Sequence, residues 1–370
     1  MSANTTRRDF VAAASLGITI MKPELVRGSQ ANSALSVGLI GSGRRGVAIS
    51  GIFARNEFAK IAALADIYDD QLEAAAQKFS GARKFKDYRE LLASDVDAVY
   101  IATPPYLHPE HFEAAVKARK HIFCEKPAGV DPAGCKRVLE ASKKADPTKR
   151  ISFDYQQRYG KEYNKAYQIV KSGELGPIKM VRAAWLGGGL PVRTGHASGE
   201  EKMRNWLFYR ELSGDILVEQ NCHNVDVVNW FMGSHPVKAA GYGGRAVRKD
   251  IGNIMDNLAV TFWMPDGTVF SYSANQFSAG GFRDISETFI CEKGTITTSR
   301  QGYTLYNGKA PVIVPTKYDI TDDAVNQFVE GARTGKIENA APWAVESTLT
   351  AIMAREAILG GRERTWRDVS

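Results

Sequence analysis

Three side chains that can take part in proton transfer are spaced as on one face of a helix. Glu219, His223 and Asp226 follow one another at intervals of four and three residues, which places side chains on one stripe of an α-helix. A carboxylate can orient a neighbouring imidazole as a base. The same pattern also fits a capped helix start, or a metal site that lacks ligands unless another segment supplies them. We favour proton transfer and assign no metal.

A glycine-rich turn after an apolar run is typical of a dinucleotide site. Residues 34–40 are apolar, Gly41, Gly43 and Gly46 follow, and residues 47–54 have helical spacing. The first glycine permits the tight turn, the second lets the backbone approach a pyrophosphate, and the third allows helix and strand to pack closely. The helix N-terminus supplies N–H groups to the anion. The alternative is a glycine turn without a ligand.

An aspartate indicates which dinucleotide is bound. A second apolar run, residues 61–65, ends in Asp66, twenty residues beyond Gly46. A carboxylate there accepts hydrogen bonds from the ribose hydroxyls of NAD and repels the 2′-phosphate of NADP. Arg44 or Arg45 could attract that phosphate, but the aspartate favours NAD.

A lysine follows another apolar run. Glu125-Lys126-Pro127 ends the run 121–125, and a lysine at the end of a buried strand beside the nicotinamide would have a lowered pKa, because burial and a cationic ring both disfavour the ammonium. A lysine at a strand end can equally be a surface residue.

These side chains need an alternating arrangement of strands and helices to bring them together. Residues 34–154 alternate in this way, with strands expected at 34–40, 61–65, 96–103, 121–125 and 151–155 and helices at 47–54, 69–79, 109–119 and 132–144. Such a series predicts a mostly parallel, doubly wound α/β sheet whose ligand lies at the carboxyl ends of the strands. The residues at those ends include Thr103, Pro104, His108, Glu125 and Lys126.

The chain changes character after residue 156. A helix at 162–172 is followed by β-type runs at 180–185, 237–245, 258–264, 268–274, 288–290 and 294–298, and by terminal helices at 322–333 and 343–359. Pro265-Asp266-Gly267 indicates a hairpin. We therefore predict an α+β domain with a mostly antiparallel sheet at 156–370, after a Rossmann domain at 34–155. The segment 186–213 is a candidate substrate loop, in which Trp206 and Tyr209 would stack on a sugar ring or simply pack.

The first residues differ in composition from the rest. Arg7-Arg8 precedes a weakly apolar stretch at 11–21, which is typical of a twin-arginine export signal and too short for an ordinary membrane span. A frayed helix is the alternative. We expect residues 1–33 to be signal and linker, cleaved or kept as an anchor, and the protein to be exported to the periplasm.

Composition excludes some other classes. The net charge is +7, but no basic run interleaved with aromatics is present, so we expect no nucleic-acid partner. Four cysteines without a C-x-x-C step are expected to be buried thiols.

Taken together, these motifs resemble those of the glucose-fructose oxidoreductase, inositol dehydrogenase and rhizopine-catabolism (Gfo/Idh/MocA) family over roughly residues 34–360. The resemblance implies bound NAD(P), redox chemistry on sugar or cyclitol hydroxyls, and an open-faced sheet used for homo-oligomerisation. Lys126 and His223 match the family's catalytic lysine and histidine, whereas Glu219 stands where the family usually has Asp and Asn221 where it often has Gly.

The expected site residues fall into three groups. Lys126, His223 and Glu219 are the catalytic candidates. The cofactor candidates are Gly41, Ser42, Gly43, Arg44, Arg45, Gly46, Asp66, Thr103, Pro104, His108, Glu125 and Lys126. The substrate candidates are Arg158, Trp206, Tyr209, Asn221 and Asp226.

The expected reaction is hydride transfer from a sugar, glycoside or cyclitol CH–OH group to NAD. His223 would accept the hydroxyl proton, Lys126 would bind the developing alkoxide, and Glu219 would orient His223 or bind a neighbouring hydroxyl. Outside the cytoplasm no nucleotide pool exists, so the cofactor would be tightly retained. Two alternatives are a glycosidase that oxidises its substrate transiently and a non-catalytic sugar or NAD sensor.

Overall fold

The computed structural model describes residues 34–370. The predicted twin-arginine signal lies outside the described residues. None of the helices within 34–370 is long and apolar enough to cross a membrane.

The N-terminal half contains the predicted parallel sheet. Its strands are β1 (Leu35–Ile40), β2 (Ala59–Ala65), β3 (Arg83–Phe85), β4 (Ala98–Ile101), β5 (His121–Cys124) and β6 (Ile151–Phe153). They lie in the order β3-β2-β1-β4-β5-β6 with all neighbours parallel. The strand order reverses between β1 and β4, which is where such sheets bind ligands.

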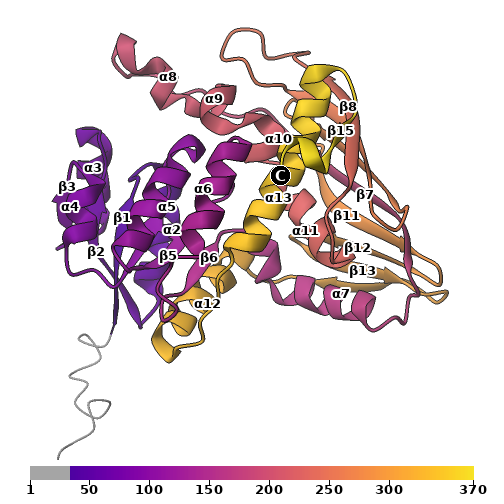
Figure 1. Cartoon of the computed structure of the whole chain (residues 1–370), viewed down its shortest axis with the longest axis horizontal. Helices are drawn as coiled ribbons and strands as arrows, with labels where there is room; N and C mark the ends of the chain where they lie inside the picture. Colours follow the sequence, from indigo (N-terminus) through magenta and orange to yellow (C-terminus); the bar gives the residue numbers. More distant parts are fainter. Residues whose placement is uncertain (1–33) are drawn as a thin grey trace, which may run out of the picture. The chain divides into compact units, whose positions relative to one another are not determined.

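Five helices accompany this sheet (Figure 1). They are α2 (Arg44–Arg55), α3 (Asp69–Lys78), α4 (Tyr88–Ala93), α5 (His108–Lys117) and α6 (Pro132–Ser142). Strand β3 and helix α4 were not predicted, because they have only three and six residues, too few for a strand or helix period to be visible.

The C-terminal half contains a nine-stranded sheet. Its strands are β7 (Ile178–Leu186), β8 (Lys238–Gly244), β9 (Asn257–Trp263), β10 (Val269–Asn275), β11 (Asp284–Cys291), β12 (Thr295–Ser299), β13 (Gly302–Tyr306), β14 (Val312–Pro315) and β15 (Arg364–Thr365). The order is β14-β13-β12-β11-β7-β10-β9-β8-β15. The predicted hairpin joins β9 and β10 as antiparallel neighbours, and β10 pairs with β7 in parallel, so the sheet is mostly antiparallel, as predicted. Strands β13, β14 and β15 were not predicted from the sequence.

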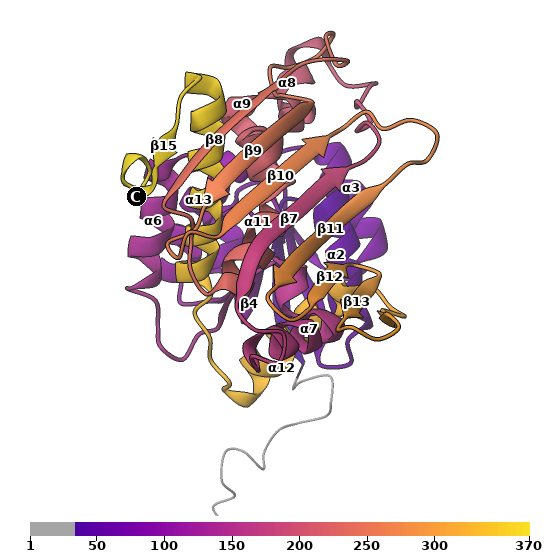
Figure 2. The same cartoon turned by 90° about the vertical axis from the view of Figure 1, so that its right-hand side faces the viewer.

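Helices cover one face of the large sheet, and within residues 34–370 no helix lies over the central strands on its other face (Figure 2). The covering helices are α7 (Lys161–Lys171), α11 (Cys222–Met232) and α13 (Ala341–Gly360). The last of these is buried along most of its length and contacts α6 of the first half as well as α10 (Asp215–Glu219), α11 and β8 of the second. It therefore connects the two halves through packed side chains.

One C-terminal helix packs on the N-terminal domain. In α12 (Ile320–Thr334), Phe328 is fully buried and packs edge-on against Phe53 of α2, with ring centroids 6.0 Å apart. The end of the chain therefore completes the hydrophobic core of the Rossmann half.

The segment that was expected to be a substrate loop contains short helices. These are α8 (Glu201–Arg204) and α9 (Arg210–Ser213), followed by α10 (Asp215–Glu219). All four cysteines are free and buried, as predicted.

Candidate active site

The glycine turn after β1 has the close approaches that its residue types predict. Gly41 has φ +96°, and a Cβ there would lie 2.8 Å from the backbone of Ala102 and Thr103 after β4. A Cβ on Gly46 would lie 2.0 Å from the Gly41 carbonyl oxygen. Only glycine fits either position, so the turn and the start of α2 hold one tight conformation.

Asp66, at the end of β2, is tied to that turn. Its Oδ2 accepts a hydrogen bond from the Ser42 backbone N–H at 2.7 Å, and its Oδ1 accepts one from the Tyr68 N–H at 2.9 Å. Burial raises the pKa of the Asp66 carboxyl above its ordinary value, although both hydrogen bonds oppose that rise.

The turn fits the phosphates of a dinucleotide. Among residues 34–370 no side chain caps the N-terminus of α2, and the buried Ser42 hydroxyl has no hydrogen-bond partner. Free N–H groups at a helix N-terminus behind a glycine turn form an anion site. Asp66 lies at the position from which a carboxylate binds the ribose hydroxyls. These residues therefore fit NAD.

Two cavities meet beside the turn. One, of about 550 Å³, extends past Asp66 and Tyr68; the other, of about 320 Å³, extends past Lys126 and His223. They share the lining residues Gly43, Ala102, Thr103, Arg193, Arg204 and Trp206. A dinucleotide site and a site for a small substrate are thus continuous.

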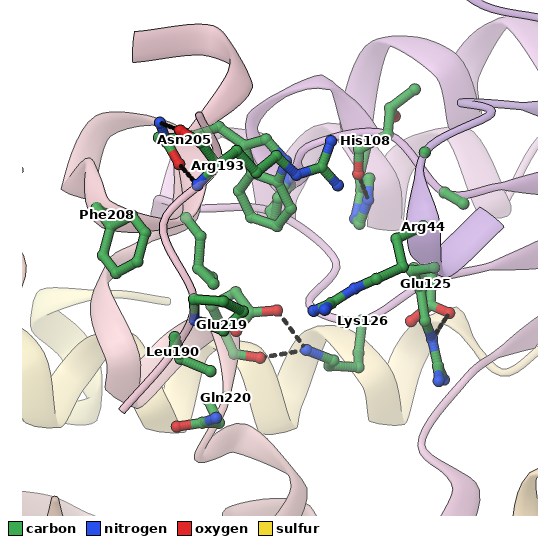
Figure 3. Close-up of a pocket in the computed structure, with 18 of the residues that line it drawn as sticks. Arg44, His108, Glu125, Lys126, Leu190, Arg193, Asn205, Phe208, Glu219 and Gln220 are labelled. Carbon is green, nitrogen blue, oxygen red and sulfur yellow. Dashed lines mark hydrogen bonds and ion pairs between the residues drawn. The ribbon is translucent and has the colours of Figure 1, made fainter. Parts of the chain in front are cut away.

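Lys126 and Glu219 face each other across the smaller cavity (Figure 3). The ammonium donates to the backbone carbonyl of Glu219 and, at 2.8 Å, to its carboxylate Oε1. Burial is the largest single influence and by itself would lower the pKa of Lys126, but the charge of Glu219, its hydrogen bond and the charges of Cys222 and Glu125 together outweigh burial, and the pKa is raised. The expectation of a lowered lysine pKa is therefore wrong, because it left out a carboxylate that only the fold brings near. Lys126 is a charged hydrogen-bond donor.

His223 lines the same cavity. Its pKa lies well below the ordinary value, first because the ring is buried and then because Arg300, Lys126 and Arg45 are nearby cations. The ring is neutral near pH 7, and within residues 34–370 its buried Nδ1 has no hydrogen-bond partner. It can accept a proton.

The expected single helix stripe does not exist. Glu219 is the last residue of α10, whereas His223 lies in the first turn of α11 after a break at Gln220 and Asn221. The two side chains reach the cavity from separate helices. The four-residue spacing therefore selected two residues that line one cavity, but not because they share a helix face.

The remaining cofactor candidates lie around the cavity in different roles. Arg45 donates to Glu125 at 2.7 Å and also to Asp154, so its guanidinium is not free for a 2′-phosphate. Arg44 extends into the cavity (Figure 3). The two ring nitrogens of His108 lie 2.7 Å from the Pro127 carbonyl oxygen and 2.9 Å from that of Thr103. His108 thus connects the turns that follow β4 and β5, and Pro104 lines the larger cavity.

Two substrate candidates form a buried ion pair instead. Arg158 donates from Nε and Nη2 to Asp226 at 2.8–3.0 Å, and Asp226 also accepts from Ser347. Neither Arg158 nor Asp226 lines the cavity that contains Lys126. Their assignment as substrate-binding residues is therefore wrong. Tertiary packing pairs the two charges with each other, so their role is structural.

The other substrate candidates lie in different surroundings. Trp206 lines both cavities. Tyr209 instead lines a separate hollow and donates to Glu201. Asn221 is buried, does not line the catalytic cavity, and within residues 34–370 its amide has no hydrogen-bond partner.

Sequence reasoning missed several residues of the cavity wall. They include Gln156, Trp185, Arg204 and Arg300. No motif marks them, since they come from a 3₁₀ turn, a strand end, a short helix and a hairpin. Within residues 34–370, no group of three His, Cys, Asp or Glu side chains is arranged to hold a metal ion.

Comparison with known proteins identifies the family. The model described as "Oxidoreductase family, NAD-binding Rossmann fold" matches residues 35–153, and the model of the "GFO/IDH/MocA C-terminal domain" matches residues 163–297. A myo-inositol 2-dehydrogenase of Thermotoga maritima is 27% identical over 258 residues, 69% of this chain and 72% of that protein. An inositol 2-dehydrogenase of Corynebacterium glutamicum is 26% identical over 265 residues, 71% of this chain and 73% of that protein.

Solved structures have the same fold. A levoglucosan dehydrogenase in complex with NADH and levoglucosan has a TM-score of 0.77 at 19% identity and covers 90% of this chain and 99% of its own. A myo-inositol 2-dehydrogenase from Lactobacillus plantarum has a TM-score of 0.74 at 22% identity with the same coverage. The chain belongs to the Gfo/Idh/MocA family of NAD-binding oxidoreductases.

Proposed function

We propose that this protein is an NAD-dependent dehydrogenase that oxidises a CH–OH group of a sugar, glycoside or cyclitol. The observation that carries the proposal is the convergence of Lys126 and His223 on a cavity continuous with the dinucleotide crevice. A charged donor and a neutral proton acceptor are what alcohol oxidation requires. The inositol and levoglucosan dehydrogenases named above support this class of substrate.

Each residue has a defined task in the reaction. NAD⁺, when bound, supplies the acceptor for the hydride that leaves the carbinol carbon. The Lys126 ammonium hydrogen-bonds the hydroxyl oxygen and stabilises the negative charge that develops on it. The neutral His223 imidazole accepts the hydroxyl proton. An alcohol and NAD⁺ thus give a ketone, NADH and one proton.

The test is NADH formation at 340 nm with a panel of cyclitols, free sugars and methyl glycosides. The wild type should reduce NAD with at least one of them, and Lys126→Ala and His223→Ala should each lose most of that turnover while still binding NADH. Turnover close to the wild-type rate in both variants would contradict the assignment.

We also propose that the cofactor is held tightly. Arg204 of α8 donates to both carboxylate oxygens of Asp70 at 2.8 and 2.9 Å, and its guanidinium lies 3.6 Å from the centroid of the Tyr68 ring. We name these three residues the Arg204 clamp. Because the clamp joins the segment after β7 to the rim of the larger cavity, it favours slow release of a dinucleotide. Gently purified protein should contain NAD(H) by mass spectrometry, and cofactor-free protein of full activity would count against this.

We further propose that the protein is exported and that it forms a homo-oligomer. The Arg7-Arg8 pair supports export by the twin-arginine route, and a bound cofactor would then be regenerated in place. The face of the large sheet without helices carries the exposed side chains of Met180, Tyr242 and Ile290, which the strand register places on one side. Such a face supports a homo-oligomer. Cell fractionation and light scattering test the two proposals.

A further inference from the structure

A half-buried arginine beside His223 forms no ion pair with a carboxylate within residues 34–370. Arg300 follows β12 and lines the smaller cavity. Its Nη2 donates to the Gln156 side-chain oxygen at 2.7 Å, while its buried Nε has no hydrogen-bond partner within residues 34–370. No ion pair in that part of the chain includes Arg300. Desolvation lowers the pKa of its guanidinium and the charges of Asp154 and Asp319 oppose this only in part, so an anion in direct contact would stabilise the charge.

Arg300 lies on the substrate side of the cavity. Its guanidinium is 5.8 Å from the centroid of the Trp185 ring, and that ring lies nearly parallel to the His223 imidazole, with centroids 6.0 Å apart and planes at 17°. Arg300 is also the charge with the largest effect in lowering the pKa of His223. A group bound to Arg300 is therefore close to the group that accepts the proton.

Three other cations of this cavity already have anions. Lys126 is paired with Glu219, Arg45 with Glu125 and Asp154, and Arg204 with Asp70 and Glu200. Arg44 and Arg193 form no ion pair within residues 34–370, but Arg44 is the first residue of α2, beside the glycine turn that fits the diphosphate, and Arg193 also lines the larger cavity. Of the three cations without an ion pair in that range, Arg300 is the one whose charge affects His223, and it is available for an anion carried by the substrate.

We propose that Arg300 binds a carboxylate on the substrate ring, so that the preferred substrates are uronic acids or their glycosides rather than neutral sugars. The inference rests on the proposed dehydrogenase function and narrows its substrate class. The planar guanidinium matches a carboxylate through two parallel N–H···O bonds, and binding supplies the missing partner of a half-buried charge. A single arginine carries one positive charge and so suits a monoanion better than a phosphate dianion.

The experiment compares matched substrates that differ in one carboxylate. NAD-loaded protein is assayed with methyl β-D-glucuronide and methyl β-D-glucoside, which keep the pyranose ring closed, and with glucose 6-phosphate. The wild type should show a kcat/KM for the glucuronide at least about ten times that for the glucoside, a difference of about 1.4 kcal/mol. Arg300→Gln should lower this ratio at least about tenfold. Arg300→Lys keeps the charge but cannot form the two parallel hydrogen bonds, and it should give an intermediate ratio.

The control is Arg283→Gln, which removes an exposed arginine outside the cavity and should leave the ratio unchanged. A wild-type ratio near one, a ratio that does not change in Arg300→Gln, or an Arg300-dependent preference for the sugar phosphate would each overturn the carboxylate assignment. The measured quantity is a ratio between two substrates, so a general loss of activity in a variant does not mimic the expected result.

A binding measurement separates this inference from the dehydrogenase proposal. If no substrate is oxidised, the proposed function fails, but glucuronide binding to NADH-loaded protein can still be followed by thermal shift. An increase in Tm with the glucuronide and not with the glucoside, lost in Arg300→Gln and kept in Arg283→Gln, supports the carboxylate site. A shift that is equal in the wild type and Arg300→Gln overturns it.

Discussion

The ammonium of Lys126 is held by both the carboxylate and the backbone carbonyl of Glu219. One residue follows strand β5 of the parallel sheet, and the other ends helix α10 of the C-terminal half. The contact therefore joins the two halves at the point where the substrate would lie, and it keeps the lysine charged. Lys126 can donate a hydrogen bond to an alkoxide but cannot act as a base near neutral pH.

Replacement of Lys126 by Ala should lower kcat by about 10²–10³-fold, the usual cost of removing one donor that stabilises a developing oxyanion. Steady-state NADH formation measures it, with Lys165→Ala, an exposed lysine of α7, as the control. Affinity for NADH should change little. A variant that retains more than a tenth of the wild-type kcat would exclude the oxyanion role.

Replacement of Glu219 by Gln should change the pH profile. Without the carboxylate, burial dominates the electrostatics of Lys126, and the raised pKa of its ammonium falls. The donor is then lost at lower pH, so the alkaline limb of log kcat/KM should move to lower pH. Glu219→Asp, which keeps the charge, should leave the limb closer to its wild-type position. An unchanged limb in Glu219→Gln would show that Lys126 does not set it.

Loss of the Arg204 clamp should weaken NAD binding. Arg204→Ala removes the two hydrogen bonds to Asp70 and the contact with Tyr68, and we expect the Kd for NADH to rise about tenfold, or about 1.4 kcal/mol. Fluorescence titration measures it, and Arg283→Ala is the control. In the double variant with Asp70→Ala the two effects should be less than additive; additive effects would mean that the pair does not act as a unit.

Two glycines of α2 should respond in opposite ways to alanine. In Gly46→Ala the new methyl group meets the Gly41 carbonyl oxygen at 2.0 Å, so the turn must distort, and both thermal stability and NADH affinity should fall. In Gly51→Ala the nearest atom is the Arg55 Nη1 at 3.9 Å, and the helix should gain about 0.5–1 kcal/mol. Thermal unfolding with and without NADH distinguishes them. Equal Tm values for the two variants would contradict the close packing at the turn.

The free energy of unfolding should fall in mild acid, partly because the buried His121 ring resists protonation in the folded chain. Its Nδ1 accepts the Arg150 N–H at 2.9 Å, and burial lowers its pKa from 6.5 to about 4. Between these values the unfolded chain binds the proton and the folded chain does not, so stability is lost as the pH falls below 6.5. One such proton changes the free energy of unfolding by up to about 1.4 kcal/mol per pH unit.

His121→Asn keeps an acceptor for the Arg150 N–H and removes the titrating ring. Urea unfolding at pH 7 and at pH 5 should therefore show a smaller acid loss in the variant than in the wild type. The other histidines with lowered pKa values are present in both proteins, so the difference reports on His121. An equal loss in both would contradict the assignment.

The sequence by itself determined the cofactor half of this protein. Gly41, Gly43, Gly46 and Asp66 act through backbone geometry and through short connections that follow adjacent strands, so their order along the chain is sufficient to place them. The same holds for Lys126, because a residue at the carboxyl end of a parallel strand faces the crevice. Periodicity likewise predicted most long strands and helices, but it did not predict the short strands β3, β13, β14 and β15, of which β3, β14 and β15 lie at sheet edges.

The tertiary structure alone decided how the site residues are charged and which of them meet the substrate. The pKa of Lys126 depends on Glu219, 93 positions along the chain, and Arg158 is removed from the site by its pairing with Asp226. Arg300 reaches the cavity from a hairpin that no motif marks. Electrostatic energy depends on distances in space and on burial, and a linear sequence gives neither for residues on different elements.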